Sequence, residues 1–114
     1  MKRLLNRRNG ALVAGNATWA STMFSRLKGL LGRASFEPGE ALILPSCSAV
    51  HMFFMRFAID IVFCDKNFQV LGIQENLRPW RISKLVPNAY YTIELPLGTI
   101  QQADIRLGDE LERS

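Results

Sequence analysis

Residues Val50–Asp65 read Val-His-Met-Phe-Phe-Met-Arg-Phe-Ala-Ile-Asp-Ile-Val-Phe-Cys-Asp, the most apolar run in the chain. Its odd positions form an almost unbroken apolar face, whereas its even positions mix apolar and polar side chains. A period of two, carried by aromatic and β-branched residues, is typical of β-strands. The run therefore predicts two strand segments, over Cys47–Phe54 and Ile59–Cys64, with a bend at Arg56–Ala58.

The rest of the chain predicts more short strands, separated by Gly and Pro turns. We expect them at Gly10–Ala14, Ala41–Leu44, Gln69–Gln74, Trp80–Leu85, Ala89–Leu95 and Glu110–Glu112. One helix is predicted at Ser21–Gly32, where apolar side chains recur at helical spacing, and one helical turn at Thr99–Ala103. This pattern indicates a mostly β fold, a sandwich or jelly-roll-like barrel with one short N-terminal helix.

Length and composition indicate a single β-rich domain over residues 10–114, preceded by a basic lead over residues 1–9 that is expected to fray. Two cysteines, Cys47 and Cys64, are too few for a disulfide framework and are expected to be reduced. No apolar run reaches the roughly 20 residues that a membrane-spanning helix needs. Gly10–Ala20 makes a poor signal-peptide core because it holds Asn16 and Thr18, so we expect a cytoplasmic protein.

Charge is unevenly distributed along the chain. Residues 1–36 hold seven Lys and Arg and no acid, whereas the remainder holds seven Lys and Arg and all ten acids. A basic first third is compatible with an anionic surface as partner, although a solvated arm with a basic helix face is the favoured interpretation. Aromatic residues are not interleaved with these cations as in single-stranded nucleic-acid platforms, so no nucleic-acid partner is indicated.

Polar side chains embedded in the apolar strands are the candidate site. Arg56 and Asp60 share one strand face, and an unpaired charge among large apolar neighbours is unfavourable. Each could bond to neighbouring backbone and hold the bend, or they could line a pocket in which Arg56 binds an anion. Glu94, inside the Ala89–Leu95 strand, is the natural third member. The candidate ligand-binding residues are His51, Phe53, Met55, Arg56, Asp60 and Glu94.

Catalytic and metal motifs are weak in this sequence. Cys47 and His51 would lie about 13 Å apart on an extended strand, too far for a nucleophile pair. One His and two Cys without a Cys-x-x-Cys spacing make a poor zinc set. We therefore expect no catalytic residue, no metal and no cofactor, and a lone His51 fits a packed, hydrogen-bonded ring. Acid–base chemistry by Asp60 and Glu94 stays open as an alternative.

Five segments together carry a resemblance to a known family. They are Arg26–Arg33, His51–Phe63, Leu77–Arg81, Ile93–Gly98 and Gly108–Asp109. In this order the chain, from about Ala11 to Leu111, resembles the bacterial and archaeal family called domain of unknown function 192. The resemblance implies a small, mostly β, sandwich-like domain and no established activity, substrate or cofactor. Some similar proteins carry export signals, and some are associated with pilus-assembly genes.

Two positions depart from the pattern that the resemblance implies. Ala58 stands where the family usually has Pro, so the bend at Arg56–Asp60 is less enforced. Phe68 stands where the family usually has Gly after a hairpin turn, which predicts either a left-handed Asn67 or a shifted turn.

Three functions follow as hypotheses. The first is a non-enzymatic module that binds a small ligand or peptide in a pocket around residues 51–60 and Glu94. The second is an accessory protein of a pilus or secretion apparatus, or of an anionic surface, that uses the basic Lys2–Arg33 region. The third is an enzyme with paired carboxylates at Asp60 and Glu94.

Overall fold

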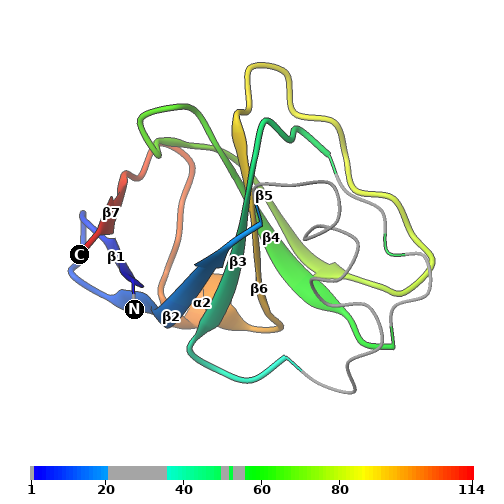
Figure 1. Ribbon diagram of the computed structural model, residues 1–114, viewed down its shortest axis with the longest axis horizontal. Coiled ribbons are helices and arrows are strands. Elements are labelled where there is room, and N and C mark those ends of the chain that lie inside the picture. Colours follow the sequence, from blue (N-terminus) through cyan, green and yellow to red (C-terminus); the bar gives the residue numbers. More distant parts are fainter. Residues whose placement is uncertain (1, 21–35, 50–51, 53–55) are drawn as a thin grey trace.

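The computed structural model describes residues 2–20, 36–49, 52 and 56–114 (Figure 1). Its strands are β1 (Lys2–Asn6), β2 (Leu12–Trp19), β3 (Glu40–Pro45), β4 (Ile59–Cys64), β5 (Val70–Leu77), β6 (Tyr91–Pro96) and β7 (Leu111–Arg113), and its described helix is α2 (Thr99–Gln102). The described strands form one sheet in the order β5-β4-β6-β3-β2-β1-β7. The predicted mostly β fold is confirmed.

The sheet is curled into a half-barrel. Its two outer strands, β5 and β7, approach each other where Gln69 and Glu110 form an isolated antiparallel bridge. The Leu111 N–H also donates to the Phe68 carbonyl at 2.9 Å. Because the described strands belong to a single sheet, the finer expectation of a sandwich or jelly roll is not confirmed.

The central strands bury both of their faces. On the α2 face, defined by Val62, Ile93, Leu95 and Ile100, the sheet packs against the short helix. On the Met52 face, defined by Leu42, Met52, Ile61 and Phe63, a second apolar cluster forms. Each fully buried side chain of this size contributes roughly 1.5–3 kcal/mol to folding. Strand β4 is buried along its whole length, which explains why its sequence is so apolar.

Strand β4 lies at the predicted residues, and β3, β5 and β6 lie close to their predicted positions. The bend expected at Arg56–Ala58 is also present immediately before β4. The helical turn expected at Thr99–Ala103 is confirmed as α2. The predicted N-terminal helix, Ser21–Gly32, lies outside the described residues, and the described helix is near the C-terminus instead.

Two strand predictions do not match the described backbone. Trp80–Leu85 is a loop with one bridge residue, because Trp80 has a left-handed φ of 68° that turns the chain toward Met52. The Trp80 N–H donates to the Met52 carbonyl, and the Met52 N–H donates to the Arg81 carbonyl, both at 2.7 Å. In Cys47–Phe54, the described residues 47–49 and 52 are not strand, since Ser46, with φ 55°, ends β3 in a turn.

The expectation that the basic lead frays is wrong. Residues Lys2–Asn6 are β1, which lies between β2 and β7. Leu4 is fully buried there, and backbone hydrogen bonds of 3.0 and 3.1 Å join Arg3 to Ser114. Among the described residues, no helix has the length and apolar character that crossing a bilayer requires.

The turn between β4 and β5 places a bulky residue in the left-handed region. Phe68 itself has φ 61°, whereas Asn67 is not among the left-handed residues, so of the two alternatives a left-handed Asn67 is wrong. A left-handed residue other than Gly costs about 1–2 kcal/mol. The Phe68 ring compensates by stacking on Tyr91, with the ring centroids 4.2 Å apart.

Candidate functional site

Asp60 is a buried carboxylate whose two oxygens both accept backbone hydrogen bonds. Its side chain is on β4, and the residue is 1% exposed. One oxygen accepts the Asn76 N–H at 3.0 Å, and the other accepts the N–H groups of Gly98 at 3.0 Å and Ile100 at 3.1 Å. Asp60 thereby ties β5 and the start of α2 to β4. These bonds go to neighbouring backbone, as the structural alternative expects, but they reach β5 and the start of α2 and not the bend at Arg56–Ala58.

Asp60 and Glu94 lie on opposite faces of the sheet. In the β4–β6 register, Asp60 is opposite Leu95, and Glu94 is opposite Ile61. Opposite residues of an antiparallel pair point to the same face, and successive residues of one strand alternate. Asp60 therefore shares the α2 face with Leu95, whereas Glu94 shares the Met52 face with Ile61. The structure does not bring the two predicted carboxylates together.

Glu94 sits between apolar neighbours at the centre of the sheet. It is flanked by Leu42 of β3 and Ile61 of β4, both on the Met52 face. The residue is 9% exposed, and its burial raises the pKa of the carboxyl to about 7. No hydrogen bond or ion pair reaches this carboxyl from any residue that the structure describes. Near neutral pH such a group can accept or donate a hydrogen bond.

The other predicted site residues are placed only in part. Arg56 is exposed in the bend before β4. His51, Phe53 and Met55 lie outside the described residues. Within the described ranges, no group of three or more His, Cys, Asp and Glu is arranged to hold a metal ion.

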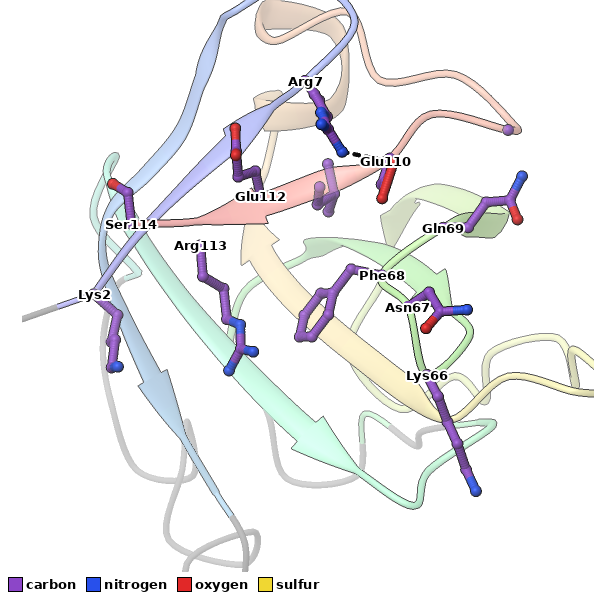
Figure 2. Close-up of a pocket in the computed structure, with 12 residues that line it drawn as sticks. Lys2, Arg7, Lys66, Asn67, Phe68, Gln69, Glu110, Glu112, Arg113 and Ser114 are labelled. Atoms are coloured by element: carbon purple, nitrogen blue, oxygen red, sulfur yellow. Dashed lines mark hydrogen bonds and ion pairs between the residues drawn. The ribbon is translucent and has the colours of Figure 1, made fainter.

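A cavity of about 880 Å³ lies elsewhere, between β7 and the turn that joins β4 to β5 (Figure 2). Arg113 lies over two rings at its inner side, 5.4 Å from the Trp19 centroid and 5.1 Å from the Phe68 centroid. At the opposite side, Arg7 pairs with Glu110 at 3.2 Å. The cavity therefore presents both signs of charge, and part of that charge is matched internally.

The sequence alone does not predict this aromatic and cationic cluster. Trp19, Phe68 and Arg113 come from β2, a turn and β7, which are far apart in the sequence. The available signal was Phe68 at a position where the family usually has Gly, since a bulky residue there needs strong packing to hold a left-handed backbone.

Asp109 has a structural role. Its carboxylate accepts hydrogen bonds from the Arg106 N–H at 2.9 Å, the Asn6 amide at 3.0 Å and the Arg8 guanidinium at 2.8 Å. Burial opposes ionisation of Asp109, but these donors, led by Arg8, together hold its pKa below the usual range. The network joins the N-terminal lead to the C-terminal turn.

Both cysteines are free thiols. Burial, and then the charge of Asp65, raise the pKa of the Cys64 thiol, so the reactive thiolate is suppressed. The Cys47 thiol donates to the Ala49 carbonyl at 3.1 Å. Neither thiol has the surroundings of an activated nucleophile.

Comparison with known proteins gives a consistent family and no activity. Residues 4–113 match the DUF192 family, described as "Uncharacterized ACR, COG1430". A UPF0127 protein of Thermococcus sibiricus is 34% identical over 113 residues, which are 96% of this chain and 73% of that protein. A UPF0127 protein of Pyrococcus furiosus is 33% identical over 115 residues, which are 96% of each chain.

The fold is similar to that of a solved protein of unknown function. The crystal structure of that protein, from Novosphingobium aromaticivorans, has a TM-score of 0.81 and 20% sequence identity, and the match covers 97% of this chain and 82% of the other. With the family match over residues 4–113, this chain belongs to the DUF192 family.

Proposed function

We propose that this protein is a non-enzymatic binding module that holds a small ligand or peptide at the Met52 face, with Glu94 as the recognition group. The observation that carries the proposal is a buried carboxyl at the centre of an apolar sheet face, with no partner among the described residues. Buried polar groups in folded proteins are nearly always hydrogen-bonded. A ligand that supplies the missing partner would bind there.

The chemistry of Glu94 restricts the ligand. A carboxyl between Leu42 and Ile61 favours a partner with an apolar body and one hydrogen-bond donor or positive charge, such as a primary amine. His51, Phe53, Met55 and Arg56 stay in the proposed site, since they lie in the segment that precedes β4. Asp60 leaves the proposed site and becomes part of the scaffold, because three backbone N–H groups occupy it.

The geometry favours this function over the two alternatives. Acid–base catalysis by a carboxylate pair is disfavoured because Asp60 and Glu94 face opposite sides of the sheet. An anionic partner on the basic lead is disfavoured because Arg7 pairs with Glu110, and Arg8 pairs with Asp104 and Asp109.

We also propose that the module acts in the cytoplasm. A signal-peptide interpretation of the first twenty residues is disfavoured because they contribute β1 and β2 to the sheet, with Leu4 and Val13 buried.

Ligand screening with matched variants tests the proposal. Small amines and short peptides are added to the purified protein, and binding is followed by thermal shift and by NMR. We expect hits that bind the wild type and lose at least tenfold in affinity in Glu94→Gln.

Thr92→Val is the control, because Thr92 lies on the same sheet face but already has a hydrogen-bond partner. It should bind the hits as the wild type does. Equal affinity of Glu94→Gln and wild type for every hit would refute the assignment of Glu94, and the absence of any hit would refute the binding module.

A further inference from the structure

The loop between β5 and β6 exposes an unusual amount of apolar surface. Trp80, Ile82 and Leu85 are 58%, 64% and 68% exposed. Half of the large hydrophobic side chains that are exposed in the described residues thus fall within six consecutive positions. A cluster of this kind is a feature of interaction sites, whereas single exposed apolar residues need no explanation.

Cations alternate with these apolar residues. Arg78, Arg81 and Lys84 are all exposed, and no acid occurs between Leu77 and Val86. We call the segment Arg78–Leu85 the basic apolar loop. In Figure 1 it belongs to the yellow segment at the outer edge of the molecule, away from β1 and β7.

The fold itself holds the apolar side chains outward. Ser83 and Val86 are buried, so they anchor the loop from within. The Lys84 N–H donates to the Gln74 side chain at 2.9 Å, and the Val86 N–H donates to the Ser48 carbonyl at 3.2 Å. The Trp80 N–H and the Arg81 carbonyl of the same loop also hydrogen-bond to the Met52 backbone. The exposed side chains are therefore displayed by an anchored loop.

From this arrangement we propose that the basic apolar loop docks the protein onto a membrane surface that contains anionic lipid. Trp and aliphatic side chains partition into the boundary between headgroups and acyl chains, and Trp is enriched at that depth. Interleaved Lys and Arg are attracted by anionic headgroups. A protein partner with an apolar patch would contact the three apolar residues, but it would not account for the three cations.

Vesicle binding by the full-length chain tests the inference. The wild type is mixed with phosphatidylcholine vesicles that contain phosphatidylglycerol, and with vesicles of phosphatidylcholine alone, and sedimented. We expect binding to the first and little to the second. Brominated lipid should quench the fluorescence of Trp80, and the quenched component should disappear in Trp80→Phe.

Variants separate the two contributions. Ile82→Ser with Leu85→Ser should weaken binding about tenfold or more, because two apolar anchors are lost. Arg78→Gln, Arg81→Gln and Lys84→Gln together should also weaken it, about fivefold for each cation removed. The matched control is Leu97→Ser with Leu107→Ser, since these residues are 57% and 64% exposed but lie outside the loop. The control should bind as the wild type does.

The alternative outcomes overturn the proposal. Equal binding to neutral and anionic vesicles, or equal losses in the loop and control variants, would remove the loop as an anionic-lipid site. If no vesicle binds but the wild type self-associates and Ile82→Ser with Leu85→Ser does not, the occupant is a second copy of the chain. These results are independent of Glu94, which lies on β6 and not in the loop.

Discussion

Asp60 and Glu94 are two buried carboxyl groups on neighbouring strands, and their surroundings are opposite. Asp60 faces α2 and accepts three backbone N–H groups from two separate segments. Glu94 faces the Met52 side and accepts none from the described residues. The comparison teaches that burial alone does not identify a functional carboxyl. The hydrogen-bond partners distinguish a carboxyl that supports the fold from one that is available to a ligand.

The largest expected effect comes from removing the satisfied carboxylate. Asp60→Ala should lower the free energy of unfolding by about 4 kcal/mol, because it leaves the N–H groups of Asn76, Gly98 and Ile100 without their acceptor. Urea unfolding followed by circular dichroism measures the loss. Asp60→Asn keeps one side-chain oxygen and should lose less. A loss below about 1 kcal/mol in Asp60→Ala would contradict the scaffold role.

A smaller, pH-dependent effect is expected for the unsatisfied carboxyl. The pKa of Glu94 is raised from 4.5 to about 7 in the folded protein, so between these values the folded state holds a proton that the unfolded chain has lost. The stability of the wild type should therefore fall as pH rises through this window. Relative to the wild type, Glu94→Gln should gain stability with rising pH, by up to about 3 kcal/mol at pH 7 and above.

Urea unfolding of both proteins across this pH range measures that difference. A difference that is constant with pH would show that Glu94 titrates normally in the folded state. It would place the carboxyl in a polar environment.

The smallest effect is expected for a satisfied polar group on the Glu94 side of the sheet. Thr92 donates to the Cys47 carbonyl at 2.7 Å, and it lies opposite Leu44 on β3. Thr92→Val should lower the free energy of unfolding by about 1 kcal/mol, the net value of one hydrogen bond. Because no charge is removed, the loss should be the same at every pH. A pH-dependent loss would mean that Thr92 is coupled to Glu94.

Local sequence patterns were sufficient for the central strands. The alternation in Ile59–Cys64 predicts β4 at its observed residues, because buried β-branched residues favour an extended backbone whichever strands lie beside it. The family resemblance also predicts the mostly β class. The sequence predicts a strand at Trp80–Leu85, but the structure has a loop there. The apolar residues of this loop face solvent instead of a core, and the left-handed φ of Trp80 cannot be recognised from the sequence.

The candidate site was harder to predict because it depends on register. The alternation of side chains along β4 tells which of its residues share a face. It does not tell which residues of β6 lie on that same face of the sheet. One residue of shift would have put Glu94 beside Asp60. The structured lead was missed for a related reason. Lys2–Asn6 is basic and short, and its outer partner is β7, at the far end of the chain.

The pairing of β1 with β7 has a consequence for protein synthesis. Strand β1 leaves the ribosome well before its partner β7, and the side-chain contact between Arg3 and Ser114 spans 111 positions. Until Leu111–Arg113 emerge, the edge of β1 that pairs with β7 has no partner strand. Such long-range pairing slows folding. The sheet can therefore be completed only after Leu111–Arg113 have left the ribosome.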